Sequence, residues 1–215
     1  MLKVNKKLQI SINERGIVLA FHDNSHNNTF TSVLKLRASA MTGKEFINRV
    51  ANGKSDIIQV FLDILSEAGS RYCVIGGLAV NAYAEPVVSL DVDVVVTVED
   101  VEAICKAAKE HGLKIESFEH SINITSPDSD LRIQLQTDQR YQGFVSITQD
   151  RPVLGYTMKV ARVEDVLQGK VWAYMDTTRR KSKRQKDLAD IFRIVEKFPQ
   201  LESSLPQNIR EELNK

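Results

Sequence analysis

The chain has 215 residues, of which 42% are hydrophobic, and its 29 lysines and arginines nearly balance 28 aspartates and glutamates. This length and apolar content suffice for one large domain with a small appendage. The balance of charge excludes a global electrostatic field for binding nucleic acid or an anionic membrane, so any such binding has to be local.

The two cysteines and the first residues indicate the compartment. Cys73 and Cys105 lie in apolar surroundings without metal-ligand spacing, which is typical of buried thiols in a reducing compartment. The first residues lead into no apolar signal segment, and no stretch approaches the ~20 apolar residues of a membrane span. We therefore expect a cytoplasmic protein without a membrane partner.

Residues 1–40 are expected to form a β-rich appendage. Alternation in Lys7–Ile12, a turn at Asn13–Gly16 and the apolar run Ile17–Phe21 predict a β-hairpin. A polar loop containing His22 and His26 precedes a third strand candidate, Phe30–Leu36. Because the loop is rich in Asn and Ser, exposed histidines are favoured over a metal site there. The antiparallel segment could serve self-association into a homo-oligomer or docking of a partner.

The pattern then changes to helical periodicity. Thr42–Glu45 is typical of a capping box and predicts a helix to about Asn52. A second helix begins at Ser55-Asp56 and ends at Gly69.

From residue 72 onwards strands and helices alternate. Tyr72–Ile75 and Val92–Val98 are predicted strands, joined by a Gly-Gly turn and a short helix that begins near Leu78. A surface helix covers Glu99–His111. The further strand candidates are Leu113–Phe118, Ile122–Thr125, Leu131–Gln136, Val145–Thr148 and Tyr156–Ala161. These elements predict an α/β (α+β) core over residues 41–199, in which helices flank a mixed β-sheet.

Two C-terminal helices complete this core. An apolar stripe predicts one helix after Glu164, and another runs through Leu188 and Val195 until Pro199. We expect residues 200–215 to form a polar, loosely held tail.

Asp91 and Asp93 form the candidate metal site. Side chains two apart on a strand project to the same face, so the two carboxylates point together while Val92 and Val94 face the core. Such a pair repels itself unless a cation neutralises it, and hard oxygen ligands suit Mg²⁺ bridged to triphosphate oxygens.

Gly76 and Gly77 directly follow a predicted strand. Glycines there let the backbone approach a phosphate closely, with amide groups at the start of the next helix as donors. The thirteen residues between this turn and Asp91 form a helix and a return loop, which brings phosphates and metal into one pocket.

Taken together, Gly76-Gly77 and Asp91-Val92-Asp93 at this spacing resemble the defining motif of the polymerase-β nucleotidyltransferase superfamily. Three later segments look like the AbiEii/AbiGii-type branch, to which toxins of bacterial toxin–antitoxin and abortive-infection systems belong. These segments are Gly155–Ala161, Glu164–Lys170 and Arg184–Asp190, and the resemblance covers about residues 70–198.

The resemblance implies roles for individual residues. Asp91 and Asp93 would bind Mg²⁺ or Mn²⁺, and Ser89 stands in place of the hydroxyl residue two before the first aspartate. Lys170 would contact phosphate and Asp187 would complete the site. Lys186 and Asp190 are second-line candidates.

The chain departs from this pattern at two places. Val87 and Val88 stand where an arginine is frequent, so a phosphate contact is missing there. Gln134 aligns with the third carboxylate, and an amide ligates Mg²⁺ weakly and cannot act as a base. Asp130 or Asp138 could substitute if the strand or loop bends.

Two further features have alternative interpretations. The basic run from Arg179 to Lys186 either steers triphosphate or RNA into the site or forms a solvated linker between helices. Trp172 and Tyr174 could stack on a base, but Trp172 is expected to fill the core.

The sequence thus predicts a metal-dependent nucleotidyltransferase that transfers NMP from an NTP to a hydroxyl acceptor. The acceptor is left open between RNA, a protein side chain and a small molecule, and the resemblance implies a toxin with an antitoxin partner. The alternative is a catalytically silent relative that retains the fold as a nucleotide-binding or protein-interaction module, for which Gln134 is the argument.

Overall fold

The computed structural model describes residues 6–13, 16–23, 34–36 and 41–213. The chain divides into two compact units, Met1–Met41 and Thr42–Lys215. No helix in these described ranges combines the length and apolar character that crossing a membrane requires.

The N-terminal unit is a three-stranded antiparallel sheet. β1 (Lys6–Asn13) pairs with β2 (Gly16–Asp23), and β2 pairs with β3 (Leu34–Leu36). The predicted hairpin is therefore confirmed. Residues 30–33 of the third expected strand and the loop histidine at position 26 lie outside the described residues.

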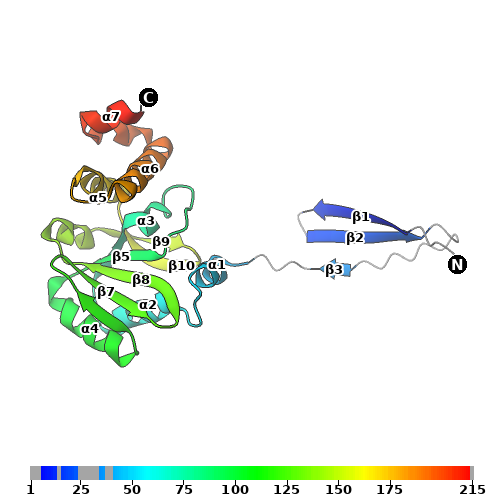
Figure 1. Ribbon diagram of the computed structural model, residues 1–215, viewed down its shortest axis with the longest axis horizontal. Coiled ribbons are helices and arrows are strands. Elements are labelled where there is room, and N and C mark those ends of the chain that lie inside the picture. Colours follow the sequence, from blue (N-terminus) through cyan, green and yellow to red (C-terminus); the bar gives the residue numbers. More distant parts are fainter. Residues whose placement is uncertain (1–5, 14–15, 24–33, 37–40, 214–215) are drawn as a thin grey trace. The chain divides into compact units, whose positions relative to one another are not determined.

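The larger unit is built on a seven-stranded mixed sheet in the order β6-β7-β8-β5-β4-β10-β9 (Figure 1). β5 runs parallel to β8 and antiparallel to β4, and β10 runs parallel to β4. In chain order the strands are β4 (Tyr72–Ile75), β5 (Asp91–Val96), β6 (Lys114–Ser117), β7 (Ser121–Ser126), β8 (Ser129–Gln136), β9 (Thr148–Val153) and β10 (Tyr156–Ala161).

Helices flank the sheet. The helices α1 (Gly43–Val50), α2 (Ile57–Glu67) and α4 (Val101–Glu110) follow the expected segments, and the predicted capping box of Thr42 and Glu45 is present. Val92 and Val94 are buried and line the same apolar space as Phe61 of α2, so this face of β5 is the core face.

The short helix α3 (Gly76–Val80) contacts β4, β5, α5 (Val163–Met175) and α6 (Lys181–Lys197). Figure 1 shows α5 and α6 side by side beyond α3, followed by α7 (Gln207–Leu213). Three short 3-10 helices complete the unit: η1 (Val98–Asp100), η2 (Gln139–Ser146) and η3 (Pro199–Ser204).

The strand predicted at Val145–Thr148 is wrong. Val145 belongs to η2, and β9 begins only at Thr148. The reason is an aromatic cluster in which Tyr141 and Phe144 pack against Trp172 of α5, with ring centroids 5.4 and 5.9 Å away. Burial of aromatic side chains three apart favours a tight helical turn over alternation. Trp172 is partly buried and packs against the hydrophobic core, in agreement with the expected core role.

The expectation of a loosely held tail is also corrected. Beyond Pro199 the chain forms η3 and α7, and it buries Leu205 and Ile209 in the core. These apolar side chains anchor a segment that is polar on average.

The cysteines are both free. Cys73 is buried and Cys105 is only half-buried. Burial, helped by the nearby Asp165 carboxylate, raises the pKa of the Cys73 thiol to about 12.

Candidate functional site

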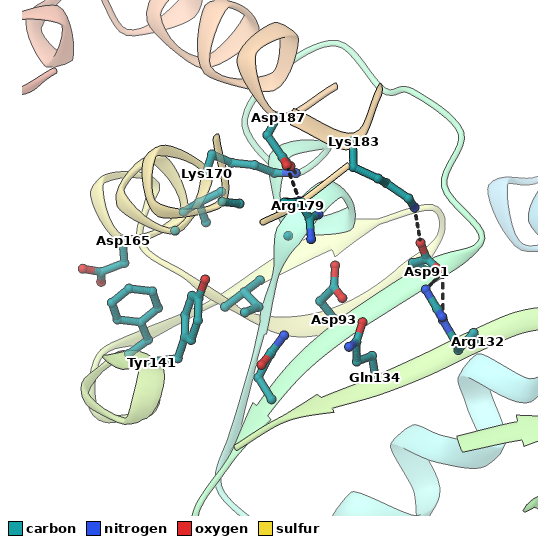
Figure 2. Close-up of a pocket in the computed structure, with 17 residues that line it drawn as sticks. Asp91, Asp93, Arg132, Gln134, Tyr141, Asp165, Lys170, Arg179, Lys183 and Asp187 are labelled. Carbon is teal, nitrogen blue, oxygen red and sulfur yellow. Dashed lines mark hydrogen bonds and ion pairs between the residues drawn. The ribbon is translucent and has the colours of Figure 1, made fainter. Parts of the chain in front are cut away.

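A polar cavity of about 270 Å³ lies beside β5 and β8 and is closed by η2, α5 and α6 (Figure 2). It is the place where carboxylates and cations from distant parts of the chain meet. Its charged lining residues are Asp91, Asp93, Asp165 and Asp187, and Arg132, Lys170, Arg179 and Lys183.

Asp91 and Asp93 both line this cavity, while Val92 and Val94 between and beyond them are buried in the core. The alternation predicted for this strand is thus confirmed. On the parallel neighbour β8, Arg132 is in register with Asp91 and Gln134 with Asp93.

Asp91 is held by two cations. Arg132 donates to its Oδ1 from Nε at 3.1 Å and from Nη2 at 2.8 Å, and Lys183 Nζ donates to its Oδ2 at 3.4 Å. Partial burial alone would raise the pKa of Asp91, but the charges and hydrogen bonds of Arg132 and Lys183 hold it below its ordinary value. The carboxylate is therefore ionised and compensated.

Asp93 has a different environment. Burial raises the pKa of Asp93, and the charge of Asp91 adds to this effect, while Lys170 and Arg179 oppose it. Figure 2 shows the Asp93 side chain pointing into the cavity with no hydrogen bond or ion pair to the other residues drawn. A carboxylate placed in this way is ready to accept a cation or a hydrogen-bond donor from a ligand.

Gly76 makes room for Asp93. Its φ is +66°, and a Cβ at this position would lie 2.1 Å from Asp93 Oδ2. Only glycine fits such a position without strain. A Cβ at Gly77 would meet nothing closer than Ser89 Oγ at 3.6 Å.

Ser89 acts on the backbone of the first aspartate. Its Oγ accepts from Asp91 N at 3.4 Å and donates to Asp91 O at 3.3 Å. Gly76 lines the cavity, whereas Gly77 and Ser89 do not. Ser89 therefore shapes the start of β5 and does not reach the cavity itself.

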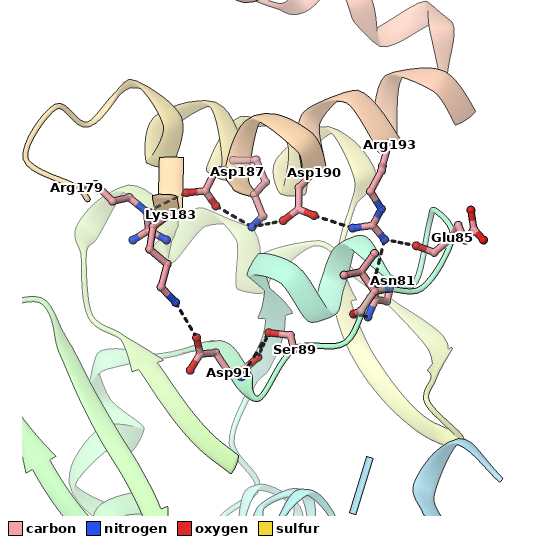
Figure 3. Close-up of polar contacts among 11 residues, drawn as sticks. Asn81, Glu85, Ser89, Asp91, Arg179, Lys183, Asp187, Asp190 and Arg193 are labelled. Carbon is pink, nitrogen blue, oxygen red and sulfur yellow. Dashed lines mark hydrogen bonds and ion pairs between the residues drawn. The ribbon is translucent and has the colours of Figure 1, made fainter. Parts of the chain in front are cut away.

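Lys170 is the centre of a buried charge network that joins α5 to α6 (Figure 3). Its Nζ lies 2.9 Å from Asp187 Oδ1 and 2.7 Å from Asp190 Oδ2, and all three side chains are at most 8% exposed. Burial alone would lower the pKa of Lys170, but the carboxylates of Asp190 and Asp187 raise it above its ordinary value.

The network continues at both ends. Asp187 Oδ2 accepts from Arg179 Nε at 2.8 Å, and Asp190 Oδ1 accepts from Arg193 Nη1 at 2.6 Å. Arg193 in turn donates to Asn81 Oδ1 at 3.1 Å and to the carbonyl of Glu85. The two helices are thereby tied to the loop that leads to Ser89 and Asp91 (Figure 3).

The structure brings together six of the positions singled out in the sequence: Gly76, Asp91, Asp93, Gln134, Lys170 and Asp187 all line the cavity. The basic run contributes only Arg179 and Lys183 to it, and Lys186 is exposed elsewhere. Val87 and Val88, where an arginine was missing, are exposed as well. The cationic side chains of the cavity therefore lie at positions other than 87 and 88.

Arg132 was not singled out from the sequence. The signal was present, because Arg132 and Gln134 share one face of β8 by alternation. Its role became visible only through the pairing of β5 with β8.

Within the part of the chain that the structure describes, neither Asp130 nor Asp138 takes the place of Gln134. Asp130 accepts from Asn52 Nδ2 at 2.6 Å and Asp138 is paired with Arg140 at 2.7 Å, and neither lines the cavity. Asp165 lines it but is bound to Arg162 and lies across the cavity from Asp93 (Figure 2). Among the residues that the structure describes, no group of three or more acidic, histidine or cysteine side chains could hold a metal ion.

No protein-family model and no curated protein sequence matches the chain. Among solved structures it is similar to the antibiotic-resistance factor ANT(2'')-Ia, with a TM-score of 0.50 and 13% identity over 73% of this chain and 86% of that one. The lincosamide antibiotic adenylyltransferase LnuA, bound to lincomycin, gives a TM-score of 0.48 and 11% identity over 66% of this chain and 99% of that one. An antigenic nucleotidyltransferase-like protein from Paracoccidioides brasiliensis gives a TM-score of 0.45 and 18% identity over 70% of this chain and 75% of that one.

Identities this low establish the fold alone. The mixed seven-stranded sheet flanked by helices matches the expected α/β architecture, and the unit Thr42–Lys215 has a polymerase-β-like nucleotidyltransferase fold.

Proposed function

We propose that this protein is a nucleotidyltransferase that transfers NMP from an NTP to a hydroxyl group. The observation that carries the proposal is the pairing of Asp91 and Asp93 in one cavity with four cationic side chains, Arg132, Lys170, Arg179 and Lys183. A triphosphate brings several negative charges, which such a set of cations can compensate. The nucleotidyltransferase fold supports the same assignment.

A divalent cation, Mg²⁺ or Mn²⁺, fits the donor set of this cavity. Mg²⁺ in nucleotide sites is commonly held by one or two carboxylates together with phosphate oxygens and water. Asp91 and Asp93 would hold it, and Asp93 is available because its carboxylate has no partner among the residues drawn in Figure 2. When bound, the ion supplies neutralisation of charge on the transferred phosphoryl group.

The reaction requires that the acceptor oxygen bond to the α-phosphorus while the bond to the β-phosphate breaks and pyrophosphate leaves. The protein's part in it is positioning and charge compensation. Arg132, Arg179 and Lys183 would bind phosphate oxygens, and Gly76 keeps space beside Asp93. Gln134 cannot take the hydroxyl proton, so an aspartate or water has to accept it.

Lys170 and Asp187, which the resemblance assigned to the site, have a supporting place in this proposal. Lys170 Nζ is already bound by two buried carboxylates, so it contributes long-range charge to the cavity and holds α5 on α6. The more exposed cations Arg132, Arg179 and Lys183 would contact the phosphate groups directly.

A toxin role with an antitoxin partner rests on the resemblance of the C-terminal segments. Lys170 and Asp187, which come from two of these segments, are in contact at 2.9 Å. Expression of the chain in a bacterial host should then inhibit growth, and Asp91→Asn with Asp93→Asn should relieve the inhibition at equal protein level. Equal growth inhibition by both forms would contradict a toxin that acts by nucleotide transfer.

The second candidate function is a nucleotide-binding module without catalytic turnover. Gln134 favours it, because it stands beside Asp93 where a third carboxylate would complete the metal site. The two functions differ in one measurable property, since a module binds nucleotide but does not incorporate it.

Calorimetry with each of the four ribonucleoside triphosphates and Mg²⁺ tests binding, and incorporation of α-labelled NTP into total RNA, protein or small molecules tests transfer. We expect the unaltered protein to bind NTP and the variant Asp91→Asn with Asp93→Asn not to bind it. The variant should stay folded, because the ion pairs that Asp91 loses are partly exposed and repulsion between the carboxylates is relieved. Binding without incorporation would select the module, and unaltered binding by the double variant would refute the site.

A further inference from the structure

The cations around the cavity differ in how exposed their ion pairs are. Lys170 is 8% exposed and contacts two carboxylates that are 3% and 4% exposed. Arg132 and Lys183 are 39% and 37% exposed and contact Asp91, which is 28% exposed. Breaking a buried ion pair is costly, whereas a partly exposed pair contributes little and exchanges partners easily.

The partly exposed ion pairs occupy both oxygens of the Asp91 carboxylate. Arg132 occupies its Oδ1 with two hydrogen bonds, and Lys183 lies 3.4 Å from its Oδ2. A divalent cation that binds Asp91 therefore has to compete with Arg132 and Lys183 for its two oxygens.

The released cations would have few other partners, because Asp93, the other carboxylate beside them, would hold the divalent cation together with Asp91. Asp187 is already bound by Lys170 and Arg179, and Asp190 by Lys170 and Arg193. A guanidinium and an ammonium group left in the cavity would raise its positive charge, and phosphate oxygens are the natural partners of both groups.

We infer that Arg132 and Lys183 are exchangeable ligands, which bind Asp91 when the cavity is empty and triphosphate oxygens when it is filled. This inference rests on the proposed function. As a consequence, metal and triphosphate bind as a unit, and the metal alone binds weakly because the two cations compete with it for Asp91.

Substitution of either cation should change the affinity for metal and the affinity for NTP in opposite directions. Arg132→Gln and Lys183→Gln each remove a competitor of the metal, so either variant should bind Mn²⁺ alone more tightly, by up to about fivefold. Each also removes a phosphate ligand, so the same variant should bind the NTP with Mg²⁺ more weakly, by about tenfold. A residue that merely stabilised the fold would weaken both.

The experiment measures free Mn²⁺ by electron paramagnetic resonance in the absence of nucleotide, and NTP binding with Mg²⁺ by calorimetry, for the full chain and both variants. Lys159→Gln is the matched control, because Lys159 forms an exposed ion pair with Asp150 and does not line the cavity. It should change neither affinity. Thermal midpoints verify that each variant is folded.

Tighter Mn²⁺ binding together with weaker NTP binding in Arg132→Gln or Lys183→Gln supports the exchange. If both affinities fall together, or if neither changes, the exchange is refuted while the proposed nucleotide site stands. If the unaltered chain binds no NTP with Mg²⁺, the proposed function fails and the exchange fails with it.

Discussion

Gly76 holds its backbone at φ +66°, in contact distance of the Asp93 carboxylate. Gly76→Ala would place a methyl group 2.1 Å from Asp93 Oδ2 in a backbone conformation that costs ~1–2 kcal/mol for an L-residue. We expect lower stability, measured by urea unfolding, and loss of NTP binding, measured by calorimetry.

Two other glycines separate the causes of this effect. Gly69 has φ +61° but open space around its Cβ position, so Gly69→Ala should cost ~1 kcal/mol of stability and leave binding intact. The methyl group of Gly77→Ala would meet only an ordinary contact at 3.6 Å, so this variant should lose neither stability nor NTP binding. Equal binding losses in all three variants would show that the clash with Asp93 is unimportant.

Lys170 and Lys159 are matched lysines in different surroundings. Lys170→Ala removes the cation that two buried carboxylates share and leaves each with one arginine, and breaking a buried ion pair typically costs ~3–5 kcal/mol of unfolding free energy. Lys159→Ala breaks an exposed pair and should cost less than ~1 kcal/mol. Denaturant titration checks both, and a Lys170→Ala protein as stable as the unaltered one would contradict a structural role of the network.

For single residues, the sequence predicts the direction of a side chain better than it predicts which residues that side chain contacts. Asp91 and Asp93 could be placed on one face by alternation alone. Their environment could not, because Arg132 and Lys183 lie 41 and 92 residues away from Asp91 and meet it only through the sheet register and the packing of α6. The burial of Lys170 was hidden for the same reason, since both its carboxylates come from the next helix.

Among the elements, those with a clear period were predictable. The strands β4, β5, β8 and β10 and the helices α1, α2 and α4 lie where alternation, capping and apolar spacing placed them. Errors arose where tertiary packing decides a short segment. In η2 an aromatic cluster with Trp172 overrides the strand pattern, and beyond Pro199 the buried side chains of Leu205 and Ile209 anchor a polar segment to the core.

The docking of α7 is testable through Ile209, which is fully buried. Ile209→Ala should lower the free energy of unfolding by ~2–4 kcal/mol, because the cavity it leaves lies inside a packed core. Gln207→Ala, at an exposed position of the same helix, should have an effect within ~0.5 kcal/mol. Chemical denaturation measures both free energies of unfolding. Equal stability of the two variants would mean that residues 200–213 form a loosely held tail.

For the whole molecule, a chain that begins at Thr42 should fold and retain NTP binding. The described core residues all lie at Ile47 or beyond, and Thr42 itself caps α1. The units Met1–Met41 and Thr42–Lys215 are separately compact, so removal of the first should leave the thermal midpoint of the second within a few degrees.

A chain that begins at Gly53 is the matched control, because it also lacks α1 and with it the buried Ile47 and Ala51. Losing these core contacts should lower the midpoint markedly, by ~2–4 °C for each 1 kcal/mol lost. Light scattering on the same proteins tests whether the N-terminal strands serve self-association or docking of a partner: self-association would give the full chain a multiple of the monomer mass and leave the chain from Thr42 monomeric, whereas partner docking would leave both monomeric. If the chain from Thr42 unfolds as early as the chain from Gly53, the larger unit depends on the strands before it. If instead both the full chain and the chain from Thr42 have the same multiple of the monomer mass, the contact between copies lies in the nucleotidyltransferase core.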